Sequence, residues 1–137
     1  MFFLVIMANK EKLGNFRKAL TGSGKEMLAG KNAKQNEEVI KQVDEDEIVL
    51  HTQMPGSPFV NIKGNADKED IKEAAVFCAK YSQAWKKSKK KPEKIEVHVF
   101  LGKDIFKIKS MKTGTFGVKK LKKIIVKKEE IESYVNE

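Results

Sequence analysis

The sequence predicts a single α+β domain, in which an antiparallel-rich β-sheet carries one long and one short helix on one face. Alternation of apolar and polar residues, the period of a half-buried strand, occurs in residues 48–53 and 95–101. Between Ile71 and Trp85, apolar and small residues recur at helical spacing. A chain of 137 residues can bury one core, and no repeat or low-complexity linker divides it.

The N-terminal half predicts a hairpin followed by a short helix. Residues 15–21 and 25–29 flank Gly22-Ser23-Gly24, which is typical of a turn. Asn32 can cap the helix that follows, because Gln35 stands at its third position. We expect the acidic run 44–47 to be a solvated connection. Residues 1–7 are apolar, too short to cross a membrane and without signal-peptide flanks, so we expect a strand or an extension there.

A turn and the long helix occupy the middle of the chain. Pro55-Gly56-Ser57 separates strand 48–53 from a second strand, residues 59–63. The long helix is expected over residues 65–89, with Asp67 as its N-cap and Asp70 three residues later. Trp85 ends its apolar stripe, either as a core anchor or as a platform on which a base stacks.

The last third of the chain predicts strands. We expect them over residues 95–101, 105–109 and 121–126, with a glycine-bounded segment at 113–117. The acidic tail, residues 127–137, either adds a helical turn or frays. The core of the single domain, residues 1–137, is thus expected at about residues 16–126.

Charge is concentrated in one part of the chain. The net charge is +9, and the segment 86–128 alone holds 16 lysines and three acidic residues. Such a block predicts a surface that faces a polyanion, the alternative being a solvated face. The lysines expected to contact phosphates are Lys86, Lys87, Lys89, Lys90, Lys107, Lys109, Lys119, Lys120, Lys122 and Lys123. Among them, Phe100, Phe106 and Phe116 either stack unpaired bases or belong to the core.

The sequence offers little for catalysis. Two histidines stand 47 positions apart, and the single cysteine, Cys78, falls on the apolar helix face. No spacing matches a metal site, and the segment around Gly24 lacks a complete phosphate loop. We therefore expect no enzyme, no cofactor and no metal. One thiol forms no intrachain disulfide, which favours a cytoplasmic protein.

Four segments in this order resemble the NFACT-R domain, the RNA-binding module of NFACT proteins in ribosome-associated quality control. They are GKNAKQNEE (residues 30–38), EIVLH (47–51) with PGS (55–57), EAA with YS in the helix, and KTGTFGVK (112–119). The resemblance covers roughly residues 16–126. The chain has Glu47-Ile48-Val49 where the motif reads Asp-Ile-Trp, and Pro58 where a histidine often follows PGS.

The resemblance implies a stand-alone, non-catalytic protein that binds tRNA or rRNA, with the large ribosomal subunit as a partner and no membrane. By motif position, its candidate contacts are Lys31, Asn32, Asn36, His51, Gly56, Ser57, Lys119 and Lys120. A general nucleic-acid binder that also takes DNA, and a small RNA-modification accessory or enzyme centred on His51, stay open as alternatives. The oligomeric state is not set by the sequence. We expect His51, with Asn36 and Ser57, either to hydrogen-bond RNA or to fix the Pro-Gly-Ser turn.

Overall fold

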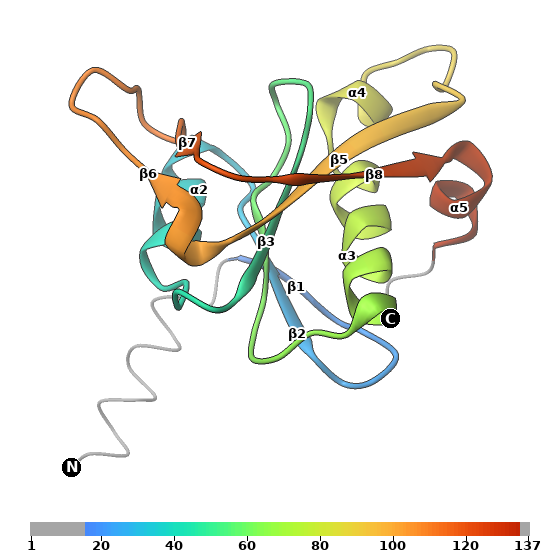
Figure 1. Cartoon of the computed structure of the whole chain (residues 1–137). Coiled ribbons are helices and arrows are strands. Elements are labelled where there is room, and N and C mark those ends of the chain that lie inside the picture. The colour runs from blue at the N-terminus through green and yellow to red at the C-terminus, as the bar shows by residue number, and fades with distance from the viewer. Residues whose placement is uncertain (1–15, 135–137) are drawn as a thin grey trace.

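The computed structural model describes residues 16–134 and has the predicted α+β class (Figure 1). Its centre is a six-stranded antiparallel sheet with the order β1-β2-β4-β3-β5-β8. The strands, in chain order, are β1 (Arg17–Leu20), β2 (Glu26–Ala29), β3 (Ile48–Thr52), β4 (Val60–Ile62), β5 (Lys94–Leu101) and β8 (Lys122–Lys127). The predicted hairpin is confirmed as β1 and β2. The expected strand at residues 1–7 lies outside the described residues.

The main core lies between the sheet and two helices, α3 (Lys68–Lys80) and α5 (Lys128–Ser133). Met27 and Leu50 from the sheet meet Phe77 of α3, and each is fully buried. Ile131 of α5 is 1% exposed, so the start of the acidic tail packs into this core. None of the helices in the described part of the chain has the length and apolar character needed to cross a membrane.

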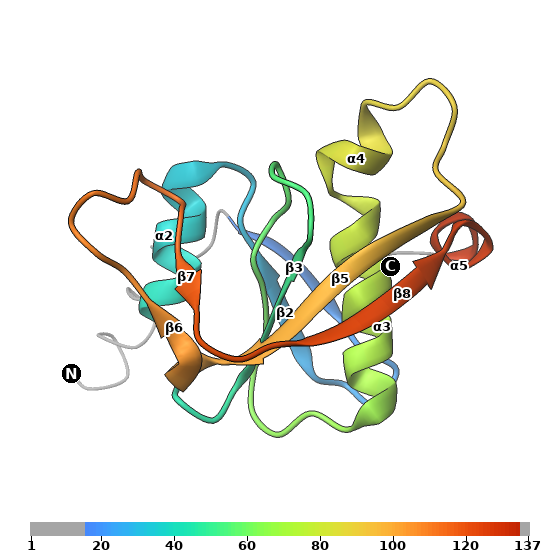
Figure 2. The ribbon, with the colours of Figure 1, turned by 45° about the horizontal axis from the view of Figure 1, so that its top comes forward.

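The opposite face of the sheet carries α2 (Ala33–Lys41) and a two-stranded hairpin, β6 (Ile105–Phe106) with β7 (Gly117–Val118). Figure 2 shows α2 and α3 on either side of β3. Leu28 and Val49, which alternate away from α3, are also buried, with Val39 of α2 against Leu28. Both faces of the sheet therefore carry buried apolar residues that need a cover, so the expectation that all helices share one face is wrong.

Both expected helix caps are confirmed. Asn32 Oδ1 accepts the Gln35 backbone N–H at 2.9 Å, which fixes the first turn of α2. Asp67 and Asp70 form a reciprocal capping box at α3, with N···O distances of 2.8 and 3.0 Å.

The long helix expected to reach residue 89 is wrong at its C-terminal end. α3 stops at Lys80, and a separate single turn, α4 (Gln83–Lys86), follows. Ser82, 1% exposed, donates to the Ala79 carbonyl at 2.7 Å and its side chain caps α4. A serine that bonds the backbone in this way competes with helix continuation. Trp85 still packs against the core after the break, so the apolar stripe continues across Ser82 and does not indicate where the helix ends.

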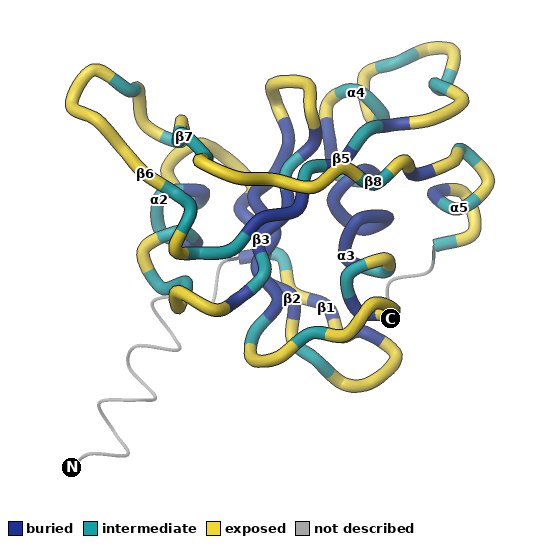
Figure 3. Tube along the Cα trace, in the orientation of Figure 1, coloured by how far each residue is buried: buried dark blue, intermediate teal, exposed yellow. Residues whose placement is uncertain are grey.

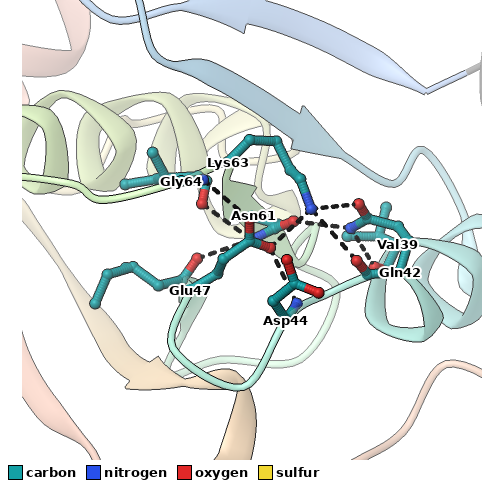
Figure 4. Close-up of polar contacts among 9 residues, drawn as sticks. Val39, Gln42, Asp44, Glu47, Asn61, Lys63 and Gly64 are labelled. Atoms are coloured by element: carbon teal, nitrogen blue, oxygen red, sulfur yellow. Dashed lines mark hydrogen bonds and ion pairs between the residues drawn. The ribbon is translucent and has the colours of Figure 1, made fainter.

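The acidic run is not entirely solvated, because Glu47 is only 5% exposed. Its carboxylate accepts from Lys63 Nζ at 2.7 Å, Gly64 N at 2.9 Å and Asp44 N at 3.0 Å (Figure 4). Burial alone would raise the pKa of Glu47, but these donors outweigh it and hold the pKa below its usual value. Lys63 also donates to Gln42 Oε1 at 2.8 Å, so this cluster joins β3, β4 and the end of α2.

Candidate nucleic-acid interface

A half-open cavity of about 740 Å³ lies where several loops meet beside α2. Its walls come from the start of α2, the β3–β4 loop, α4, β5 and the β6–β7 loop. In Figures 1 and 2 these loops and α4 project from one side of the molecule. The cavity brings together seven of the candidate contacts, namely Lys31, Asn32, Asn36, His51, Gly56, Ser57 and Lys86.

The β3–β4 loop is held in place by the motif side chains. Asn36 Oδ1 accepts the Phe59 N–H at 3.1 Å. Ser57 Oγ accepts the Thr52 N–H at 3.0 Å and donates to the Pro58 carbonyl at 2.9 Å. Asn36 and Ser57, both buried, thus fix the Pro-Gly-Ser turn.

Gly56 lets this loop approach α4 closely. Its φ of 84° lies in the left-handed region, and a Cβ there would come 2.7 Å from Gln83 Cγ. The Gln83 N–H donates to the Gly56 carbonyl at 2.9 Å. Replacement of this glycine would therefore separate two walls of the cavity.

His51 presents a hydrogen-bond acceptor to the cavity. Its Nδ1 lies 2.6 Å from the Thr52 carbonyl oxygen, which can only accept, so Nδ1 carries the proton. Burial, with a smaller contribution from His98, lowers the pKa of His51 in spite of the Thr52 bond, so the ring is neutral. The neutral ring leaves Nε2 as an acceptor. Within residues 16–134, no protein group bonds this nitrogen and no buried side-chain nitrogen lacks a partner, so Nε2 is open to solvent.

His98 lies directly across from His51, and Lys123 lies across from His98. The three side chains therefore form a row over β3, β5 and β8 on the face that bears α2. His98 Nε2 lies 2.7 Å from Glu96 Oε2, and this hydrogen bond lowers the pKa of Glu96. Lys123 approaches the same carboxylate at 3.8 Å. The two strands that hold His51 and His98 were both predicted, but their register, which places the histidines together, was not.

Lys107 is occupied by protein oxygens. Its Nζ donates to Glu37 Oε2 at 2.6 Å, to the Lys112 carbonyl at 2.7 Å and to the Thr115 carbonyl at 2.9 Å. Glu37 also accepts the Gly114 N–H at 2.6 Å. Burial would raise the pKa of Glu37, but these bonds hold it below its usual value.

These contacts tie the β6–β7 loop to α2. They also explain why the strand expected over residues 105–109 is wrong, since β6 ends at Phe106 and the chain then turns toward Glu37. Lys107 therefore supports the cavity wall, whereas the sequence predicted that it contacts phosphate.

The remaining candidate lysines lie outside the cavity lining and are exposed. Lys87, Lys89 and Lys90 follow the cavity-lining Lys86, and Lys109 lies in the β6–β7 loop. Four more lysines flank Leu121, a lining residue 40% exposed, in the exposed β7–β8 connection and the start of β8 (Figure 3). These four are Lys119, Lys120, Lys122 and Lys123. Among the described residues that line the cavity, there is no aspartate or glutamate.

The aromatic candidates separate by burial. Phe100 is 4% exposed, belongs to the core and also lines the cavity. Phe106 is 38% exposed but does not line the cavity. Phe116 lines it, with its ring 5.4 Å from that of Phe59 and Lys107 Nζ 4.5 Å from its centroid. Trp85 is half-buried against the core, and Lys91 Nζ lies 5.2 Å from its ring centroid.

Comparison with known proteins assigns the family. The sequence model of the NFACT protein RNA binding domain matches residues 15–120. The chain belongs to this family. The match includes all four of the segments that indicated the family, each of which contributes to the cavity lining, and it ends before β8. The resemblance inferred from the four sequence segments is confirmed.

This NFACT RNA-binding domain is similar to parts of two longer chains. An archaeal Rqc2 homolog, aRqcH of Methanocaldococcus jannaschii, is 42% identical over 64 residues, which cover 44% of this chain and 10% of that protein. The solved C-terminal region of the fibronectin/fibrinogen-binding protein from Streptococcus suis superimposes with a TM-score of 0.74 at 23% identity. That superposition covers 86% of this chain and 48% of the solved one, and shows a shared fold. The chain thus spans about a tenth of the first relative and about half of the second.

Proposed function

We propose that this NFACT RNA-binding domain binds tRNA or rRNA and acts in ribosome-associated quality control, on the large ribosomal subunit in the cytoplasm. The observation that carries the proposal is the cavity. Residues of all four family segments line it, no described lining residue is acidic, and exposed lysines lie along its edges. The family description supports RNA as the ligand, and the Rqc2 homolog supports the process.

The lysines suit a phosphate backbone on two sides of the cavity. One group begins at Lys86 in α4, and the other surrounds Leu121 between β7 and β8. Exposed lysines gain affinity by releasing counterions from RNA, which is independent of base sequence. We infer that these lysine groups provide most of the affinity for RNA and that the cavity determines which RNA is bound.

We propose a binding role without catalysis. A histidine that acts as a general base is usually oriented by a carboxylate or a comparable partner. The Nδ1 of His51 donates instead to the Thr52 carbonyl, and the His51 ring packs against Phe59 at a tilt of 41°, with 4.4 Å between ring centroids. These contacts fix the ring, and within residues 16–134 no carboxylate touches it.

The proposal is tested by sequencing RNA that is cross-linked to the protein in its own cells. The comparison protein is a variant with Lys119, Lys120, Lys122 and Lys123 changed to glutamate, which keeps the cavity. Defined positions of tRNA or of large-subunit rRNA should be enriched with wild type over this variant. Cross-links that follow RNA abundance, with no difference between the two proteins, would overturn the proposal.

A further inference from the structure

We propose that the cavity holds one unpaired RNA nucleotide, whose ribose 2′-hydroxyl donates a hydrogen bond to His51 Nε2. The proposal rests on the RNA-binding function proposed above and adds the feature that the site selects. In this proposal His51 positions the nucleotide and allows the site to distinguish RNA from DNA.

The tautomer of His51 determines which groups it can bind. Because Nδ1 donates to Thr52, the open Nε2 of the neutral ring can only accept a hydrogen bond. An ionised phosphate offers oxygens that also only accept, so it is a poor partner for this nitrogen. The 2′-hydroxyl is a donor found on every ribonucleotide and absent from DNA.

The ring is also held rigidly. Phe59, 5% exposed, supports one face of His51, and Asn36 fixes the backbone of Phe59. A preorganised acceptor loses little conformational entropy on binding, which favours selection by a single hydrogen bond.

The size and lining of the cavity suit a nucleotide removed from a helix. About 740 Å³ is within the range of pockets that hold small ligands and cofactors. Leu121 and Phe116 give it an apolar wall on which a base can lie, and Lys31 and Lys86, both exposed, stand where flanking phosphates can pass. A paired base is stacked inside its duplex and cannot enter a pocket without being extruded.

The experiment compares three single-stranded oligonucleotides of one mixed sequence, made as RNA, as DNA and as 2′-fluoro RNA. The fluoro form keeps the sugar pucker of RNA but has no hydroxyl donor. Fluorescence anisotropy at one salt concentration should show wild type binding RNA about tenfold more tightly than either analogue, the effect of one good hydrogen bond.

Two variants locate the selective contact. His51→Phe keeps a ring on Phe59 and removes the acceptor, so its affinities for all three oligonucleotides should become equal. His98→Phe changes the facing histidine, whose Nε2 is already engaged by Glu96, and should keep the preference for RNA. Thermal melts show whether each variant is folded. If His51→Phe does not fold, the comparison of RNA with 2′-fluoro RNA on wild type still tests the hydroxyl contact.

Each other outcome has a defined meaning. Equal wild-type affinity for RNA and 2′-fluoro RNA would overturn the hydroxyl contact, even with weaker DNA binding, since sugar shape would then explain the difference. Equal loss of preference in both histidine variants would overturn the assignment to His51. Both results leave the proposed RNA-binding function in place, whereas failure of wild type to bind any of the three would contradict that function itself.

Discussion

The lysines around Leu121 provide the sharpest test of how this protein holds RNA. All four are exposed, and among the carboxylates of residues 16–134 the one ion pair with these lysines is Glu96 with Lys123, at 3.8 Å. Reversal of all four to glutamate should weaken RNA binding at least about tenfold, because each removes one phosphate contact and adds a repulsive charge. The loss of four contacts should also reduce the slope of log affinity against log salt by about 3–4 units.

The control has the same net charge at another place. It reverses four lysines elsewhere on the domain, namely Lys18, Lys25, Lys41 and Lys68. Each set of four reversals takes the formal net charge from +9 to +1. The two variants therefore differ in where the positive charge lies and not in how much there is.

RNA affinity is measured for wild type and both variants from about 50 to 200 mM salt, a range over which lost phosphate contacts have a large effect. Thermal melts should stay close to wild type, since an exposed pair such as Lys123 with Glu96 contributes about 0–1 kcal/mol. If the control variant loses as much affinity and slope as the test variant, the reasoning is refuted and only net charge matters.

Three further predictions concern single side chains. Glu47→Gln should lower the free energy of unfolding by about 2–3 kcal/mol at pH 7. Because the pKa of Glu47 is depressed in the folded state, the difference between wild type and variant should shrink as pH falls through that pKa. Urea unfolding of both proteins at pH 7 and pH 3 would measure it. Trp85→Ala should cost about 2–3 kcal/mol, less than a fully buried tryptophan, without changing the RNA affinity of the folded protein. Because the pKa of His51 is below 6.5, its Nε2 stays an acceptor at pH 7.5, and RNA affinity should not rise as pH falls to 6. A rise that persists in His51→Gln would point to His98, which faces His51 from β5.

Local signals predicted local structure well. The hairpin turn, the Asn32 cap and the Asp67–Asp70 capping box depend on residues within a few positions of one another, and all three occur. The break at Ser82 was not predicted, because the apolar periodicity continues through it. Its cause is one buried hydroxyl that bonds the backbone, and no pattern of hydrophobicity records such a bond.

The candidate site was predicted in part, for a related reason. The four family segments contain most of the residues of the cavity wall, but His98 and Leu121 reach it through strand register and the path of a loop. The role of Lys107 depends on Glu37, which is 70 positions away, and a lysine in a basic run gives no sign of such a partner. Sequence composition located the charge, but only tertiary contacts show that Lys107, although exposed, is bonded to protein oxygens.

The tie between Glu37 and the β6–β7 loop has a consequence for biosynthesis. Its bonds to Lys107 and Gly114 span 70 and 77 positions, so the wall that they hold cannot close until most of the domain has been made. Closing such long loops carries an entropic cost that is offset only when the distant contacts form. A nascent chain that has not yet emerged as far as Leu121 therefore has its first motif but no cavity. The cavity therefore forms only after synthesis has passed the β6–β7 loop and Leu121, and the chain cannot use it to bind RNA before that point.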